Sequence, residues 1–209
     1  MELDPIAIRL LGCLVEKEMT TPDYYPMTAN SLTAAANQKT NRSPVASYAE
    51  TDVLDAVNAL RELGLVRTVR SPGGRAAKYK HALDDVLQID REQAALLAVL
   101  MLRGEQTAGE LRLRSERYHA FPSVSAVEEV LGDLERRQQP LAERLERRPG
   151  EKEARYRHLL GDRDEPAARP AAAASPESAP HRGGLAELQE RVGRLESRVA
   201  ELEAKLAGS

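Results

Sequence analysis

The sequence predicts a mainly α fold with small β-hairpins (α+β), made of two tandem copies of one module followed by a linker and a coiled-coil helix. Five blocks of the first half recur in the same order in the second half. A segment rich in Pro and Ala then begins, and a heptad pattern of apolar residues follows it. These observations predict domains at 1–84 and 85–160, a disordered linker at 161–184 and a coiled coil at 185–207.

The repeat consists of short matching stretches. "YKHAL" at 79–83 matches "YRHLL" at 156–160, and "TDVLDAVNAL" aligns with "SAVEEVLGDL". The three remaining pairs are "IAIRLLGCL" with "EQAALLAVL", "TANSL" with "TAGEL", and Pro72-Gly73 with Pro149-Gly150. Because the gaps fall only where loops are expected, the pattern indicates duplication of one supersecondary unit.

Each copy shows the same succession of elements. Apolar residues at helical spacing predict a first helix over residues 5–18, and Thr28 is expected to cap the second helix. Thr51 is expected to open the third helix and Ser125 its counterpart in the second copy. A strand "LVRTVRS", a Gly-rich turn and a strand "AKYKHA" follow. Three helices and a hairpin in this order are typical of a winged helix.

Composition narrows the classes of function. The chain has 30 Lys and Arg against 33 Asp and Glu, a net charge of −3, so any surface for nucleic acid must be local. Aromatic residues make up only 3%, which argues against base stacking on aromatic rings. A single cysteine excludes an intramolecular disulfide, and no signal peptide or bilayer-spanning run is evident, so we expect a cytoplasmic protein.

Residues 5–160 resemble a known family. The stretches "LLGCLVEK", "TTPDYYP" and "NQKTNRSPV" occur in the order shown by the YceH family of bacterial proteins. The resemblance implies two tandem winged-helix domains. It implies no particular activity, because winged helices serve both as DNA readers and as protein-docking modules.

The first hairpin is one candidate contact surface. Between residues 65 and 81 there is no acidic residue and there are five basic ones, Arg67, Arg70, Arg75, Lys78 and Lys80. Contacts from these cations to phosphates would add affinity with little sequence choice. The alternative is that the charges only keep an exposed hairpin soluble. The second hairpin mixes its cations with glutamates, and both third helices begin with acidic residues, which argues against major-groove reading.

The loop "NQKTNRSP" at 37–44 is a second candidate. Lys39 and Arg42, with the neighbouring amides, suit a phosphate or an acidic partner surface. The alternative is a polar connector in which Asn37 or Asn41 takes a left-handed turn.

The tail carries a third pattern. Apolar residues alternate at spacings of three and four, at Leu185, Leu188, Val192, Leu195, Val199, Leu202 and Leu206. This heptad pattern predicts a parallel two-stranded coiled coil that dimerises the chain.

Candidate catalytic residues are not evident. No Cys and His cluster has zinc spacing, and no nucleophile lies near a base in the sequence, so we expect no metal, no cofactor and no enzymatic activity. The leading hypothesis is association with double-stranded DNA through its backbone, in regulation or chromosome maintenance. The alternative is a protein-interaction scaffold that binds no DNA. A third partner would be the chain itself, through the coiled coil.

Overall fold

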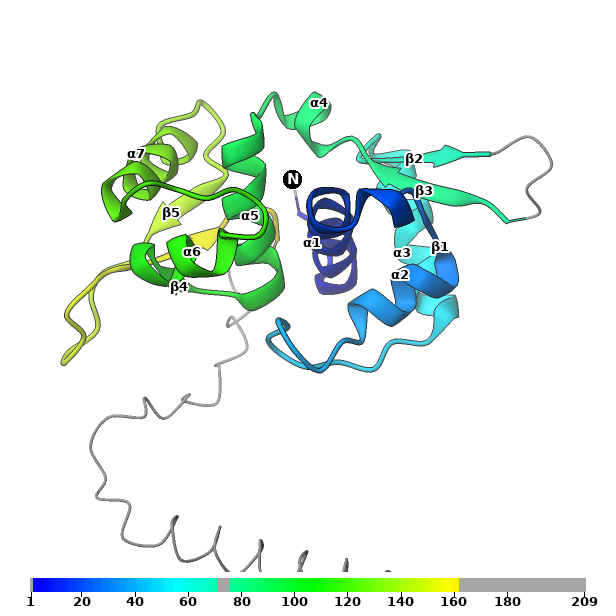
Figure 1. The fold of residues 1–209 in the computed structure, drawn as a ribbon, viewed down its shortest axis with the longest axis horizontal. Helices are drawn as coiled ribbons and strands as arrows, with labels where there is room; N and C mark the ends of the chain where they lie inside the picture. The colour runs from blue at the N-terminus through cyan, green and yellow to red at the C-terminus, as the bar shows by residue number, and fades with distance from the viewer. Residues whose placement is uncertain (1, 71–75, 162–209) are drawn as a thin grey trace, which may run out of the picture. The chain divides into compact units, whose positions relative to one another are not determined.

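The computed structural model describes residues 2–70 and 76–161. These residues belong to one compact unit. Apart from Gly161, the predicted linker and coiled coil therefore lie outside the described residues. The described part has a mixed α/β fold with seven α-helices and two small antiparallel sheets (Figure 1).

The first half follows the predicted order of elements. Its elements are α1 (Pro5–Thr20), a 3-10 turn (Pro22–Tyr24), β1 (Met27–Thr28), α2 (Ala29–Ala36), α3 (Glu50–Glu62), β2 (Val66–Val69) and β3 (Lys78–His81). The strands form an antiparallel sheet in the order β1-β3-β2. The sequence analysis missed β1 because two residues are too few to show an alternating pattern.

The second half repeats this arrangement. A short helix α4 (Leu83–Leu87), which the sequence analysis did not predict, joins the two halves, and the predicted domain boundary after residue 84 falls within it. The elements that follow are α5 (Arg91–Arg103), β4 (Gln106–Thr107), α6 (Ala108–Ser115), α7 (Val124–Glu135), β5 (Ala142–Arg144) and β6 (Arg155–His158). Their sheet has the matching order β4-β6-β5.

The predicted helix starts were right for the second helix and wrong for the third. The hydroxyl of Thr28 accepts a hydrogen bond from the Ser31 amide at 3.2 Å, which confirms it as the cap of α2. The third helices begin earlier than Thr51 and Ser125, with Ala49 and Ser123 as their caps. Both cap residues have extended backbone dihedrals, so the helical conformation begins at the residue that follows each of them.

The two halves share one hydrophobic core, because α1 packs along α5 at the centre of the fold (Figure 1). Leucines with no exposed surface occupy both helices: Leu10, Leu11 and Leu14 in α1 and Leu96, Leu97 and Leu100 in α5. Each helix is apolar around most of its circumference, which a helix on the surface of an independent domain would not be. Among the described residues, no helix combines the length and apolar character needed to cross a bilayer.

Gly12 of α1 lies against α5, with no space for a side chain. A Cβ atom at this position would lie 2.9 Å from Cγ of Leu102 and 3.1 Å from Cβ of Met101, both on α5. We therefore expect Gly12→Val to lower the free energy of unfolding by about 1–3 kcal/mol through overpacking. Urea unfolding monitored by circular dichroism would measure it.

Gly109 in α6 provides the control. A Cβ atom there meets nothing closer than 3.8 Å, so Gly109→Ala should be neutral or slightly stabilising. Equal stability of the two variants would contradict the close packing of α1 on α5.

Candidate functional site

The cations of the first hairpin share one face of its sheet. In the register of β2 with β3, Arg67 lies opposite Lys80 and Val69 lies opposite Lys78. Directly opposed residues point to the same side of a sheet, and alternate residues along a strand point to the same side. Arg67, Lys78 and Lys80 therefore lie on one face, while Tyr79 and His81 are buried on the other.

One of these cations has an acidic partner. Arg67 forms an ion pair with Asp85 of α4 at 2.9 Å, with more than half of each side chain exposed. Arg70 is exposed where β2 ends, whereas Arg75 lies outside the described residues. The hairpin itself contains no acidic residue, so the sequence does not reveal this partner, which lies on α4.

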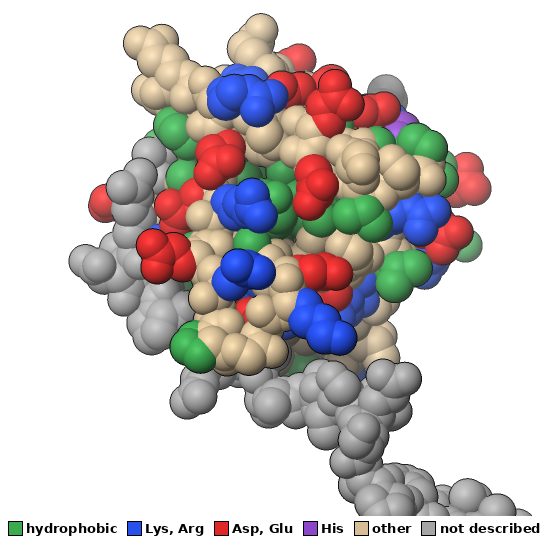
Figure 2. Space-filling model, turned by 90° about the vertical axis from the view of Figure 1, so that its left-hand side faces the viewer, with side chains coloured by type: hydrophobic (Ala, Val, Ile, Leu, Met, Phe, Trp, Pro, Cys, Tyr) green, Lys and Arg blue, Asp and Glu red, His purple; other side chains and the backbone are tan. Residues whose placement is uncertain are grey.

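Three of the six cations of the second hairpin form ion pairs. Ion pairs join Arg148 to Glu105 at 2.5 Å, Arg155 to Glu110 at 2.9 Å, and Arg157 to Glu143. On the face of the second half that Figure 2 shows, basic and acidic side chains are interspersed without a region of one sign. Within the described residues, the second hairpin therefore has more ion-paired cations than the first, in which only Arg67 has an acidic partner.

The third helices present acidic side chains to solvent. Glu50, Asp52 and Asp55 of α3 are exposed, as are Glu128 and Glu129 of α7. These carboxylates would meet DNA phosphates with charge of the same sign, so the geometry agrees with the expectation that neither helix reads a major groove.

Arg42 does not lie on the surface, which corrects the expectation that it offers a charge to a partner. Its side chain has no exposed area, and its guanidinium lies 2.5 Å from Oε2 and 3.2 Å from Oε1 of Glu16 in α1. It also donates to the carbonyl of Ala35 at 3.0 Å and to the side-chain oxygen of Gln38 at 3.0 Å. A buried charge requires such complete pairing, and a loop sequence alone does not reveal a partner 26 residues away.

Glu16 also connects the two halves of the fold. Its Oε1 accepts a hydrogen bond from the hydroxyl of Tyr118 at 2.9 Å, across 102 residues of sequence. Burial alone would raise the pKa of Glu16, but the hydrogen bonds and charge of Arg42 outweigh burial and lower it. Burial and the nearby Glu16 charge raise the pKa of the Tyr118 phenol, so it remains a hydrogen-bond donor. Glu16 is therefore ionised and bonded from both sides.

Further contacts fix the loop between the halves. Arg9 of α1, buried and missed by the sequence analysis, donates to the carbonyl of Pro44 at 2.8 Å. The amide of Ser43 donates to the carbonyl of Leu102 in α5 at 2.9 Å, and Arg103 donates to the side chain of Asn41. Arg9 and Glu16 could have been noticed in sequence as charges inside an apolar helix, since buried charges require partners.

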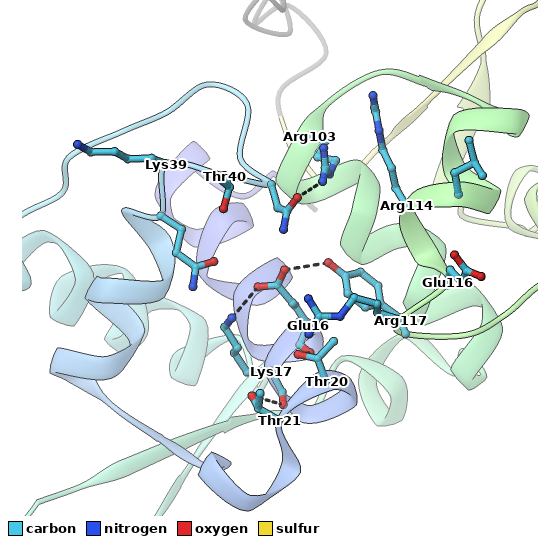
Figure 3. A pocket seen from close by; sticks show the side chains of 14 residues that line it. Glu16, Lys17, Thr20, Thr21, Lys39, Thr40, Arg103, Arg114, Glu116 and Arg117 are labelled. Carbon is cyan, nitrogen blue, oxygen red and sulfur yellow. Dashed lines mark hydrogen bonds and ion pairs between the residues drawn. The ribbon is translucent and has the colours of Figure 1, made fainter. Parts of the chain in front are cut away.

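The left-handed turn expected in the loop is present. Asn41 has φ 61°, and the predicted alternative of a structured connector therefore describes this part of the loop. Lys39 is exposed at the rim of a cleft that the loop forms with the second half (Figure 3).

Three other titratable side chains, Cys13, His81 and His158, lie within the fold. Burial raises the pKa of the Cys13 thiol to about 11, against the effect of the Arg42 charge. His81 Nε2 lies 2.7 Å from Oε2 of Glu18, and burial lowers the pKa of His158 to about 4. Among residues 2–70 and 76–161, no group of His, Cys, Asp and Glu side chains is arranged to hold a metal ion.

The structure defines a mixed α/β protein in which a unit of helices and a hairpin occurs twice. The chain belongs to the family described as "Protein of unknown function, DUF480", which matches residues 3–151. A UPF0502 protein of Geotalea uraniireducens is 47% identical over 200 residues, 96% of this chain and 90% of the relative. A UPF0502 protein of Azoarcus sp. is 48% identical over 204 residues, 97% of this chain and 90% of the relative. Similarity to these relatives therefore extends past residue 161.

Loss of the buried cation should destabilise the fold. Arg42→Ala removes the buried cation that lies closest to Glu16, and removing one partner of a buried ion pair costs about 3–5 kcal/mol. Lys39→Ala, in the same loop but exposed, should leave the unfolding transition nearly unchanged. Urea titration of both variants measures the difference, and equal stability would mean that the pair is not buried in solution.

The pH dependence of stability provides a second readout of the same ion pair. Because the pKa of Glu16 is lower in the folded chain, its stabilisation is complete above the unfolded-state value of about 4.3 and is lost as pH falls through the folded-state value. The double variant Glu16→Gln, Arg42→Met lacks this titration. Its free energy of unfolding should therefore fall less than that of the native chain between pH 7 and about pH 3.

Proposed function

We propose that each half of this chain is a winged helix and that the protein, which we take to be non-catalytic, associates with double-stranded DNA through the backbone phosphates. The order of elements supports the winged-helix assignment. In each half three helices are followed by a hairpin, and a short third strand precedes the second helix. The hairpin β2–β3 is then the first wing, and it is the part of the protein that contacts phosphates.

One observation carries this proposal, the alignment of Arg67, Lys78 and Lys80 on one face of the first wing. In the second wing, the equivalent strands hold ion pairs such as Arg157 with Glu143. Because the net charge of the chain is −3, a face that carries only positive side chains does not follow from its overall composition. Such a face attracts phosphates without distinguishing bases, because sequence is read at base edges.

Charge reversal on the first wing should abolish DNA association. The variant Arg67→Glu, Arg70→Glu, Lys78→Glu replaces attraction by repulsion at each position. For the native chain, affinity for a duplex should fall about 40-fold between about 50 and 200 mM salt if three phosphates are contacted. Fluorescence anisotropy of a labelled duplex measures both effects.

Two control variants test whether DNA affinity depends on the position of the cations or only on the net charge of the chain. Arg144→Glu, Arg147→Glu, Lys152→Glu adds the same charge to the second hairpin and should retain most of the affinity. Asp85→Asn frees Arg67 from its surface ion pair and should strengthen binding slightly, as exposed pairs contribute below about 1 kcal/mol. Tight, sequence-selective binding that survives the first-wing reversal would contradict the proposal.

The exposed carboxylates of α3 and α7 favour a second candidate function, a scaffold that docks a partner protein with a basic surface. Glu50, Asp52 and Asp55 on the first of these helices form an acidic surface that suits such a partner and repels DNA. An acidic partner would instead bind the first wing. Under the scaffold function, the native chain binds no duplex, and reversal at α3 rather than at the wing abolishes partner binding.

The C-terminal segment is proposed to dimerise the chain. Leu185 and Val192 occupy position a of the heptad and Leu188 and Leu195 position d, a combination that favours a parallel pair of helices. In that pairing, Arg191 of one chain faces Glu196 of the other. The alignments with these relatives cover 96% or more of this chain, so they extend into the C-terminal segment.

The dimer should be sensitive to single changes in the heptad seam. We expect Leu195→Asp to convert the full chain to a monomer, while Ala200→Asp at position b, outside the seam, retains the dimer. About three heptads give a concentration-dependent association. Sedimentation velocity over a range of concentrations measures it against a chain ending at Gly161. A monomeric native chain at high micromolar concentration would show that the pattern does not dimerise the protein.

A further inference from the structure

A cleft of about 580 Å³ lies where the loop 37–44 meets the second half of the fold (Figure 3). The end of α1 and the loop form one side, with Lys17 and Lys39. The end of α5, the helix α6 and the turn after it form the other, with Arg103, Arg114 and Arg117. The volume is in the range of small-molecule sites, about 300–1,000 Å³.

The charges around this cleft are unequal. Five cations line it, against the two carboxylates of Glu16 and Glu116. Glu16 is neutralised by the buried Arg42 and lies 3.4 Å from Lys17 Nζ, so it contributes little negative potential. Among the described residues, Arg117 has no ion-pair or hydrogen-bond partner, and Figure 3 shows its side chain extending toward Glu16.

Two arginines of the second half repel each other at the cleft. Arg103 is half-buried, and burial together with the charge of Arg114 lowers the pKa of its guanidinium. Arg114 has one acidic neighbour, Glu110, at 3.3 Å. Like charges held in a partly enclosed space concentrate positive potential there, and a bound anion relieves the repulsion.

Neutral donors complete the lining. The side-chain oxygen of Gln38 accepts from Arg42 at 3.0 Å, which leaves the amide nitrogen of Gln38 as the group that can donate into the cleft. The buried ion pair thus orients a lining residue as well as the loop. Arginine is the side chain whose planar donors match phosphate oxygens, in pairs of parallel hydrogen bonds.

We propose that this cleft binds the phosphate group of a small anion and that the bound anion holds the two halves of the fold together. Its cations come from both halves, so a phosphate among them bridges α1 and the loop to α5 and α6. The site is independent of the first wing, because it shares no residue with it. A free phosphate compound and a phosphate of a nucleic acid would meet the same donors.

Calorimetric titration of the full chain at constant ionic strength tests this proposal. The probe is inorganic pyrophosphate, and a short single-stranded oligonucleotide is titrated separately. We expect saturable pyrophosphate binding that Arg114→Gln, Arg117→Gln weakens at least tenfold. Arg136→Gln, Arg144→Gln removes the same charge from the second half outside the cleft and should leave the affinity within about twofold, as distant exposed charges are screened.

The outcomes are distinguishable. Saturable binding of the oligonucleotide alone, lost in the cleft variant, would support the site and assign its phosphate to nucleic acid. Absence of binding by both probes, or equal loss in the cleft and control variants, would overturn the proposal. The first-wing reversal variant serves as a further comparison, since it should bind pyrophosphate as the native chain does. Circular dichroism of each variant verifies that it is folded.

Discussion

The structure depends on one buried ion pair, Arg42 with Glu16. Two charges removed from water are tolerated only if each is fully hydrogen-bonded, and here the loop, α1 and the second half all contribute partners. Because Arg42 bonds Ala35 and Asn41 as well as Glu16, the polar loop is held in one conformation. Apart from Pro44, the loop 37–44 has no apolar side chain, so charge and hydrogen bonds hold it in place of hydrophobic contacts. The same pair fixes the wall of the cleft between the halves.

The duplicated units are not independent domains, for a physical reason visible in their first helices. The helices α1 and α5 are buried around most of their circumference, and each supplies the surface that the other must cover. Either half alone would expose a row of leucines to water. Close approach at Gly12 allows the two helices to share one core, and the positions of the two hairpins follow from that packing.

The sequence predicted local features and missed contacts between distant residues. Helix periodicity, the Thr28 cap and the two hairpins depend on neighbours in the chain, and the structure contains them. The partner of Arg42 lies 26 residues earlier, and α4 with Asp85 carries no clear pattern, so neither pairing was predicted. The cleft combines residues of both halves, which one sequence without its fold cannot bring together. For the same reason, the sequence left open whether the loop is a contact surface or a structured connector, and it did not reveal that Arg42 is interior.

The two halves have similar elements and unequal charged surfaces. Both halves contribute one buried helix. In the described part of the first hairpin the cations have no acidic partner within the hairpin, whereas in the second hairpin Arg157 pairs with Glu143 and Arg155 with Glu151. The two cationic surfaces also differ physically. The hairpin β2–β3 is open to solvent, so salt would screen its proposed attraction to phosphates at separations beyond about 10 Å. Arg103 in the cleft is half-buried. Salt screens a charge less at such a position, and paired hydrogen bonds to a phosphate contribute more to its binding. In these proposals, the open hairpin attracts long polyanions and the partly enclosed cleft binds a single phosphate, so the two surfaces bind the same group by different physical means.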